Sequence, residues 1–195
     1  AVGKDAMSAS YSTPGVSLLL TAPAGDVSDL TQQAAAHAGG GCQLTDIGTS
    51  FSSPIVTGVI ALMLEANPDL TWRDVQGILA TTSRPVTHTI FEDKTQTING
   101  AGLTHSNLYG FGIVDAFGAV TAAQTWPMYG QEQLLTASAS NLNLRISDNP
   151  NEPLVVELSI PAMGGNQILV ENVEVDLYIE HLSRGHLKVD LVSPD

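Results

Sequence analysis

Apolar residues crowd the chain between positions 55 and 64 and predict a helix that is buried on most of its sides. Pro54 falls in the expected first turn, where its missing N–H costs nothing. The polar sequence Gly48-Thr49-Ser50 therefore leads into the start of a buried helix. The apolar positions behind this prediction are Ile55, Val56, Val59, Ile60, Leu62, Met63 and Leu64.

A second helix is predicted by its start and stop signals. Thr71 and Asp74 form a variant capping box, with aspartate in place of the usual glutamate. The helix should end near Ser83, because Pro85 cannot extend it. Its expected apolar face consists of Val75, Ile78 and Leu79.

The rest of the first 127 residues predicts strands, loops and one more helix. Asp115 is expected to cap a helix from Ala116 to about Gln124. The other expected segments are a buried strand at 16–23, a long surface excursion at 24–47, a polar loop at 87–104 and a strand at 109–112.

The pattern changes after Trp126-Pro127. Residues 128–153 are polar and rich in serine and asparagine, which is typical of a linker. Beyond them apolar and polar residues alternate, which predicts half-buried strands that are antiparallel neighbours in a sandwich, joined by a turn at 183–185. The chain thus divides into 1–127, 128–153 and 154–195. The alternating apolar residues are Val173, Val175, Leu177 and Ile179, then Leu187, Val189 and Leu191.

Charge and composition narrow the class of protein. The 195 residues include 20 acidic and 7 basic ones, for a net charge of −13, which argues against nucleic acid or an anionic membrane as a partner. With no uninterrupted apolar run of about 18 residues, no transmembrane segment is expected, and no signal peptide is visible. Cys42 is the single cysteine. It excludes a disulfide within the chain and is typical of a small buried residue or a free thiol.

Ser50 is the candidate catalytic residue, as a nucleophile. A helix N-terminus carries unsatisfied N–H groups and the positive end of the helix dipole, so the Ser50 N–H can help to hold an oxyanion while the hydroxyl attacks a carbonyl. Gly48 would let a substrate backbone come close. The alternative is that Ser50 only caps the helix, a role in which serine is common. The helix argument alone leaves both interpretations open.

Longer motifs bring in a family resemblance. The run 48–58, Gly-Thr-Ser-Phe-Ser-Ser-Pro-Ile-Val-Thr-Gly, resembles the nucleophile signature of subtilisin-like serine proteases, and residues 64–76 and 105–116 resemble its kexin and furin branch. His181, Arg184-Gly185-His186-Leu187 and 191–194 resemble the opening of the family's P domain, with histidine where Arg-Gly-Asp-Leu is usual. The resemblance implies an α/β fold: the C-terminal part of a subtilisin-like parallel-sheet domain, followed by the first strands of an all-β jelly-roll P domain.

The same resemblance implies a serine endopeptidase acting on protein or peptide substrates outside the cytoplasm, whether secreted, periplasmic or at the cell surface. Ser50 would be the nucleophile, and its N–H would form part of the oxyanion hole. The catalytic histidine, the catalytic aspartate and the oxyanion asparagine are expected upstream of Ala1, and the P domain is expected to be cut at Asp195. As a fragment with one triad member, the chain by itself is expected to be inactive. In subtilisin, loss of the histidine alone lowers the turnover number about 10⁶-fold.

Further features are implied only by the resemblance. Cys42 would pair with a cysteine far upstream, and calcium is expected, with no ligand assigned. Thr13 stands near the place where the family offers glutamate, so the family's cleavage after paired basic residues does not carry over to this chain. Asp26, Asp29 and Asp46 could face a basic substrate, although solvated surface carboxylates are the simpler interpretation.

Other interpretations were weighed on their residues. His37 precedes Ser50 by too few residues to be the family's histidine and is expected on an exposed loop, and His105 is expected to be structural, beside the strand at Tyr109. The sequence lacks the Gly-x-Ser-x-Gly elbow of α/β-hydrolases and a Gly-x-Gly-x-x-Gly dinucleotide fingerprint. The competing function is a non-catalytic secreted module or pseudoenzyme. The remaining histidines are His88, His181 and His186.

Overall fold

The computed structural model describes residues 1–27, 47–86, 95–160 and 170–192. It divides into two units, Ala1–Glu132 and Gln133–Asp195, which are treated separately. The predictions for the excursion between 28 and 46 and for residues 87–94 therefore lie outside the described residues, as do His37, Cys42 and His88.

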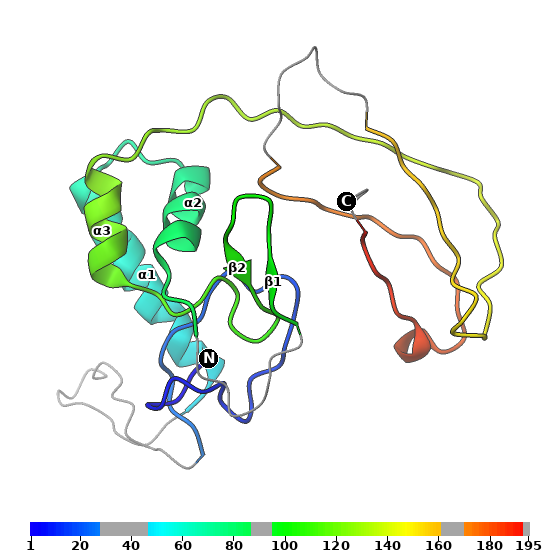
Figure 1. The fold of residues 1–195 in the computed structure, drawn as a ribbon, viewed down its shortest axis with the longest axis horizontal. Helices are drawn as coiled ribbons and strands as arrows, with labels where there is room; N and C mark the ends of the chain where they lie inside the picture. Colours follow the sequence, from blue (N-terminus) through cyan, green and yellow to red (C-terminus); the bar gives the residue numbers. More distant parts are fainter. Residues whose placement is uncertain (28–46, 87–94, 161–169, 193–195) are drawn as a thin grey trace, which may run out of the picture. The chain divides into compact units, whose positions relative to one another are not determined.

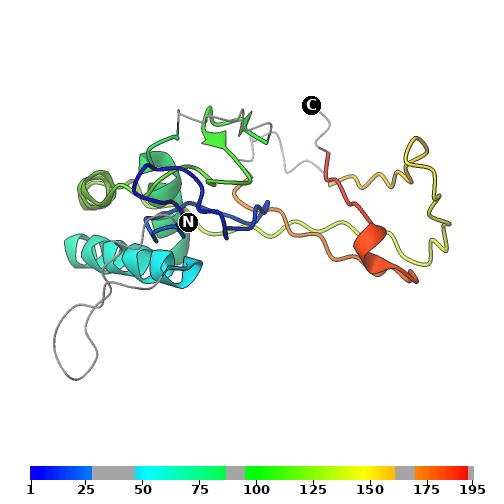
Figure 2. The ribbon, with the colours of Figure 1, turned by 90° about the horizontal axis from the view of Figure 1, so that it is seen from below.

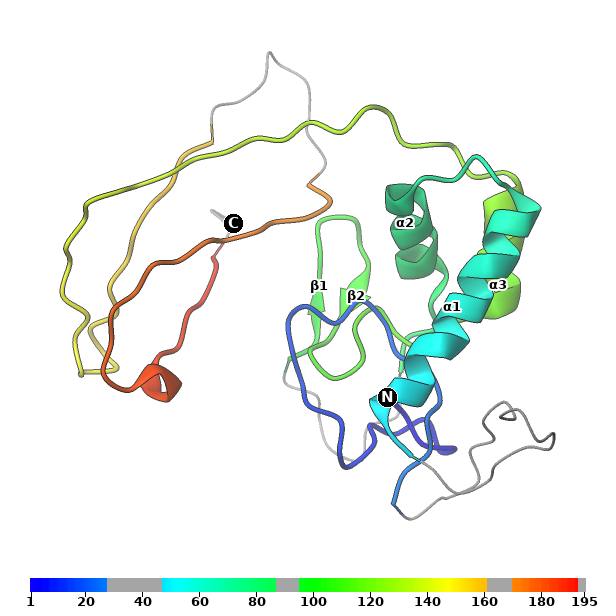
Figure 3. The same ribbon diagram turned by 180° about the vertical axis from the view of Figure 1, so that it is seen from behind.

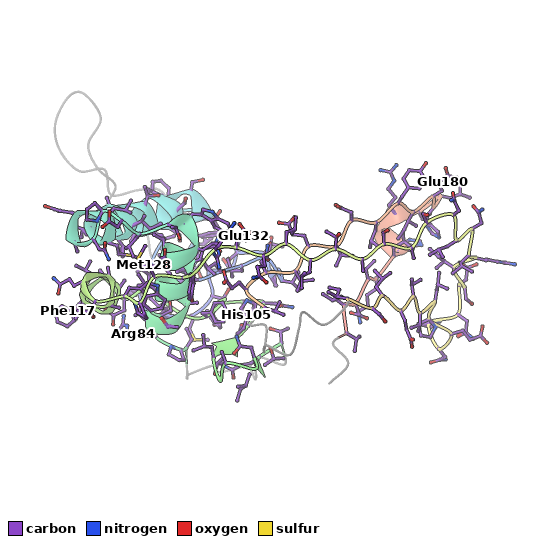
Figure 4. The ribbon with its side chains drawn as sticks, turned by 90° about the horizontal axis from the view of Figure 1, so that it is seen from above. Arg84, His105, Phe117, Met128, Glu132 and Glu180 are labelled. Carbon is purple, nitrogen blue, oxygen red and sulfur yellow. The ribbon has the colours of Figure 1, made fainter. Side chains whose placement is uncertain are left out.

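Three helices form the body of the first unit: α1 (Thr49–Ala66), α2 (Trp72–Thr82) and α3 (Ala116–Gln124). Helix α3 packs against both α1 and α2 (Figures 1 and 3). Phe117 projects from the outer face of α3, away from the core, with 83% of its surface exposed (Figure 4). The core between the helices and the neighbouring extended segments consists of Ala22, Val59, Met63, Leu70, Val75, Ile78, Leu79, Val114, Ala119 and Ala123.

Helix α1 differs from its prediction at its start and in its burial. It begins at Thr49, which places Pro54 in the second turn instead of the first. Within the described residues only Val59 and Met63 of α1 are buried, while Leu62 and Leu64 are exposed. The prediction of burial on most sides is therefore wrong for the part of the chain that the structure describes, because the packing partners cover one side of the helix.

The length and apolar composition of α1 also bear on the expectation of no transmembrane segment. With a mean hydropathy of 1.3 over 18 residues, α1 is the one described helix long and apolar enough to cross a bilayer. Core helices of globular domains meet the same criterion, so it weighs little. The expectation stays a prediction.

Helices α2 and α3 confirm their predictions. The Thr71 hydroxyl accepts a hydrogen bond from the Asp74 N–H, the Asp74 carboxylate accepts one from the Thr71 N–H, and α2 ends at Thr82. The Asp115 carboxylate caps α3 by accepting a hydrogen bond from the Gly118 N–H at 2.9 Å. These caps satisfy N–H groups that have no partner inside the helix.

Extended segments lie beside the helices as a rudimentary sheet of isolated bridges. Val2 pairs with Pro23 and Thr21 with Ile113, both in parallel, and Ile113 pairs with Arg84 in antiparallel. The predicted strand at 16–23 is therefore wrong over its first half, where Val16 is 81% exposed. Among the described residues, backbone hydrogen bonds from this segment to residues 106–114 begin at Leu19, whose carbonyl accepts from the Phe111 N–H, and continue at Thr21, whose N–H donates to the Gly112 carbonyl.

The predicted strand at 109–112 is wrong over its first half, where the Ser106 and Gly110 backbones exchange two hydrogen bonds around a tight turn at 107–109. Phe111 and Gly112 do bond the neighbouring segment, at Leu19 and Thr21, and Gly112 has φ 127°. A Cβ at Gly112 would lie 2.2 Å from the Arg84 carbonyl oxygen, so glycine is what lets these two backbones pair. The predicted loop at 87–104 contains part of a small antiparallel hairpin, β1 (Thr97–Ile98) and β2 (Thr104–His105), seen in Figures 1 and 2.

The second unit does not show the predicted strands. Over 133–160 and 170–192 the chain is without strand pairing, and its one regular element is a single 3₁₀ turn, η1 (Arg184–His186), at the predicted turn. The alternating residues Val173, Val175 and Leu177 are about half exposed. Alternation alone cannot make a sheet, because a strand needs a hydrogen-bonded neighbour and few strands cannot bury a common core.

A buried carboxylate at the start of α2 fastens the segment that follows α3. Asp74 is fully buried and accepts hydrogen bonds from the Trp126 indole N–H (3.2 Å) and the Tyr129 N–H (2.8 Å), besides those from Thr71. Arg73 adds a hydrogen bond to the Gly130 carbonyl and lies over the Tyr129 ring. The capping box of α2 thus also holds residues 126–130.

The hydrogen bonds decide the charge state of this carboxylate. Burial raises the pKa of the Asp74 carboxyl, but the Thr71 hydroxyl, the N–H groups of Tyr129 and Thr71 and the Trp126 indole together outweigh it and bring the pKa below its ordinary value of 3.8. Because its pKa is lower in the folded state, the Asp74 carboxylate stabilises the fold at pH values above its ordinary pKa. That stabilisation is lost as the pH falls through the folded-state pKa.

We predict that Asp74→Asn lowers the free energy of unfolding at pH 7 by about 2 kcal/mol or more, because buried donors then face an amide that matches them poorly. Urea unfolding of the purified protein at pH 7 and pH 3 measures this. The variant should also lose less stability than the native protein on acidification. Asp69→Asn is the matched control, since Asp69 is an exposed acid two residues before the capping threonine. Equal stability of the two variants at pH 7 would contradict the prediction.

Candidate active-site serine

Ser50 is the second residue of α1, and Gly48 is the N-cap. The alternative in which Ser50 is the capping residue is therefore wrong. Gly48 has φ 149° and ψ 154°, a conformation that is essentially restricted to glycine, and makes no side-chain cap. The Ser50 side chain is exposed and has no hydrogen-bond partner within the described residues. The hydroxyl is left available at a helix N-terminus.

Pro54 changes the hydrogen bonding around this serine. In an α-helix the carbonyl of residue 50 would accept a hydrogen bond from the N–H of residue 54, and proline has no N–H to donate. At the helix start the Phe51 N–H also donates to the Gly48 carbonyl, at 3.0 Å. Thus the start of α1 is secured by groups outside the regular helical pattern.

Two side-chain contacts fasten the start of α1 to the segment at 22–25. The Ser52 hydroxyl donates to the Ala22 carbonyl at 2.8 Å. The Tyr11 hydroxyl accepts a hydrogen bond from the Gly48 N–H at 3.1 Å and lies 3.1 Å and 2.8 Å from the carbonyl oxygens of Ala24 and Gly25. Ser50 is therefore flanked by contacts on both sides of it along the chain.

Tyr11 is a feature that sequence reasoning passed over, because it stands in a stretch of turn-forming residues with no periodicity. Its environment keeps the phenol protonated. Partial burial raises the pKa of Tyr11, and so does the negative charge of Asp26, while the hydrogen bond from Gly48 lowers it. At neutral pH the hydroxyl therefore remains able both to donate and to accept.

The other candidates of the sequence are not gathered at Ser50. The His105 Nε2 is 2.9 Å from the Leu18 carbonyl oxygen, and its ring meets that of Phe111 edge-on at 5.0 Å, which confirms its structural role. His181 contacts the Ser183 carbonyl in the second unit. Within the described residues no histidine contacts Ser50.

The acidic candidates are also not gathered at Ser50 within the described residues. Asp26 accepts hydrogen bonds from the Ser10 N–H, the Ser10 hydroxyl and the Val27 N–H, so it ties a turn together. Thr13 is exposed, and Asp29 and Asp46 lie outside the described residues. Over 1–27, 47–86, 95–160 and 170–192, no three histidine, cysteine or acidic side chains come together to hold a metal ion. No calcium ligand is assigned on these residues.

A comparison with known families identifies the family of the chain. The family model described as "Subtilase family" matches residues 2–112, more than half of the chain. The chain therefore belongs to the subtilase family. Residues 2–112 carry α/β subtilase sequence, and the relatives place the chain with the kexin and furin branch.

Two curated relatives are named as a proprotein convertase and as an endoprotease. The chain is 40% identical to proprotein convertase subtilisin/kexin type 6 of Rattus norvegicus over 155 residues, which cover 75% of the chain and 16% of that relative. It is 35% identical to endoprotease bli-4 of Caenorhabditis elegans over 80% of the chain and 17% of that relative. The chain thus spans about a sixth of the length of these relatives.

A solved structure supports the fold alone. A serine protease of Aeromonas sobria, in complex with its chaperone, superposes with a TM-score of 0.57 and 21% identity over 71% of this chain and 30% of that one. The same protease solved without the chaperone gives a TM-score of 0.52.

The geometry of the N-cap yields a prediction. Gly48→Ala should lower the free energy of unfolding by about 1–3 kcal/mol, because alanine is strained at φ 149° although its Cβ would have room. Gly58→Ala, inside α1 with no atom within 4 Å of the added carbon, should instead stabilise by up to about 1 kcal/mol. Urea denaturation of both variants measures the difference. Equal shifts of the same sign would count against the N-cap geometry.

Proposed function

We propose that this chain carries the nucleophile of a serine endopeptidase and that Ser50 is that nucleophile. The observation that supports the proposal is an exposed serine hydroxyl without a hydrogen-bond partner among the described residues, in the first turn of a helix whose N-cap is a glycine. The sequence around it matches the subtilase family. Several relatives carry endoprotease or proprotein convertase in their names.

The proposed reaction is acyl transfer. The Ser50 Oγ attacks the scissile carbonyl carbon, and a histidine takes its proton and passes it to the leaving amine as the C–N bond breaks. Water then hydrolyses the acyl-enzyme ester. The described residues supply the nucleophile and the Ser50 N–H for the oxyanion. The histidine, the aspartate that orients it and a second oxyanion donor are proposed to come from a longer protein of which this chain is a part.

Other properties of that longer protein are proposed on the family resemblance. Residues 1–127 would belong to the peptidase domain, 128–153 to a linker and 154–195 to the opening of a jelly-roll P domain. Cys42 would pair with an upstream cysteine. The protein would enter the secretory pathway or leave the cell, as the proprotein convertase relatives suggest, act on proteins or peptides, and use calcium structurally.

A covalent probe tests the nucleophile. A serine-reactive fluorophosphonate should label the full-length protein at Ser50, forming the Oγ–P bond as fluoride leaves, and should not label the chain of residues 1–195 alone, which lacks the histidine that takes the proton. Ser50→Ala should abolish labelling. Ser53→Ala, an exposed serine three residues further along the same helix, should leave it unchanged.

Mass spectrometry of the labelled peptide reads out the site. Folded full-length protein that is not labelled would overturn the proposal and favour the pseudoenzyme or binding module. Labelling that survives Ser50→Ala would assign the nucleophile to another residue.

A further inference from the structure

We propose that Tyr11 is a positioning residue for Ser50: its hydroxyl clamps the Gly48 N–H to the carbonyls of residues 24 and 25 and so fixes the start of the nucleophile helix. The proposal rests on the proposed function of Ser50 and adds to it a residue that does not touch the reacting atoms. It sits 37 residues upstream of the glycine that it holds.

The contacts of the phenol are complementary. The oxygen accepts from the Gly48 N–H at 3.1 Å, while the hydroxyl hydrogen is shared between the Ala24 carbonyl at 3.1 Å and the Gly25 carbonyl at 2.8 Å. One hydroxyl thus serves as acceptor for the helix start and donor to the neighbouring segment. Tyrosine is the side-chain type that carries a hydroxyl on an apolar ring.

The ring provides the second half of the clamp. Tyr11 and Phe51 both pack against the small buried cluster of Ala1, Ala9 and Ala24. Phe51 directly follows Ser50, and Gly48 precedes it by two residues. The serine is therefore held through its neighbours on both sides, by a hydrogen bond before it and by packing after it.

The clamp acts where the backbone is costly to hold. Gly48 occupies a conformation open to few residues, and Pro54 cannot donate the helical hydrogen bond that the Ser50 carbonyl would accept. Without the phenol the Gly48 N–H can turn to water and the first turn can shift. A displacement of about 1 Å in a reacting group costs on the order of a hundredfold in rate.

The test uses Tyr11→Phe in the full-length protein, with Tyr109→Phe as the matched control. The Tyr109 hydroxyl likewise accepts a hydrogen bond from a backbone N–H, that of Ser8 at 3.1 Å, but forms no hydrogen bond to α1 among the described residues. Both variants lose one phenol-to-amide hydrogen bond and keep the ring, and Tyr11→Phe also loses the donation to the carbonyls of residues 24 and 25. Tyr11→Phe should therefore lower the melting temperature at least as much as Tyr109→Phe.

Two readouts separate positioning from stability. In Tyr11→Phe the maximal rate of fluorophosphonate labelling at Ser50 should fall about tenfold, with the probe concentration at half-saturation unchanged, and amide hydrogen exchange of residues 48–51 should accelerate. Tyr109→Phe should change neither. Equal labelling rates in the two variants, or no change in exchange at 48–51, would overturn the clamp. If the native protein is not labelled at Ser50 but Tyr11→Phe still accelerates hydrogen exchange at 48–51, the proposed function is overturned and the contact is purely structural.

Discussion

The first unit depends on the extended segment from Thr21 to Gly25, because several neighbouring segments form backbone or side-chain contacts with it. Val2 pairs with it on one side and Ile113 on the other. The Ala22 side chain is fully buried in the helical core. Buried backbone groups must find partners, and a segment that supplies them to several neighbours at once fixes where all of those neighbours lie.

The start of α1 takes its place from this segment. Ser52 donates to the Ala22 carbonyl, and Tyr11 bridges the Gly48 N–H to the carbonyls beyond it. A serine nucleophile must be exposed and yet held still, and these two demands conflict for a residue at a helix end, where chains fray. For the proposed nucleophile Ser50, the hydroxyl has no hydrogen-bond partner among the described residues, while the residues around it are fastened.

A second network of hydrogen bonds joins α2 to the segment after α3. Asp74 serves first as a capping residue for α2 and then as a buried acceptor for Trp126 and Tyr129. Because the carboxylate is shared, the stability of α2 and the path of the chain after α3 are coupled. A buried polar network of this kind is stabilising only while all of its donors are satisfied.

The sequence by itself determined the features that depend on neighbouring residues: the bounds and caps of α2 and α3, and the glycine and serine at the start of α1. Capping is local chemistry, so Thr71, Asp74 and Asp115 were recognisable without a fold. Family membership was equally visible, since it rests on long runs of residues in order. The tertiary structure decided what depends on distant partners. It set Gly48 rather than Ser50 as the N-cap, left one side of α1 uncovered, and left the alternating residues near Val173 without strand partners, because pairing and burial require a second segment that no local pattern specifies. It also brought Tyr11 to Gly48, a contact that joins residues 37 apart and that no local pattern indicates.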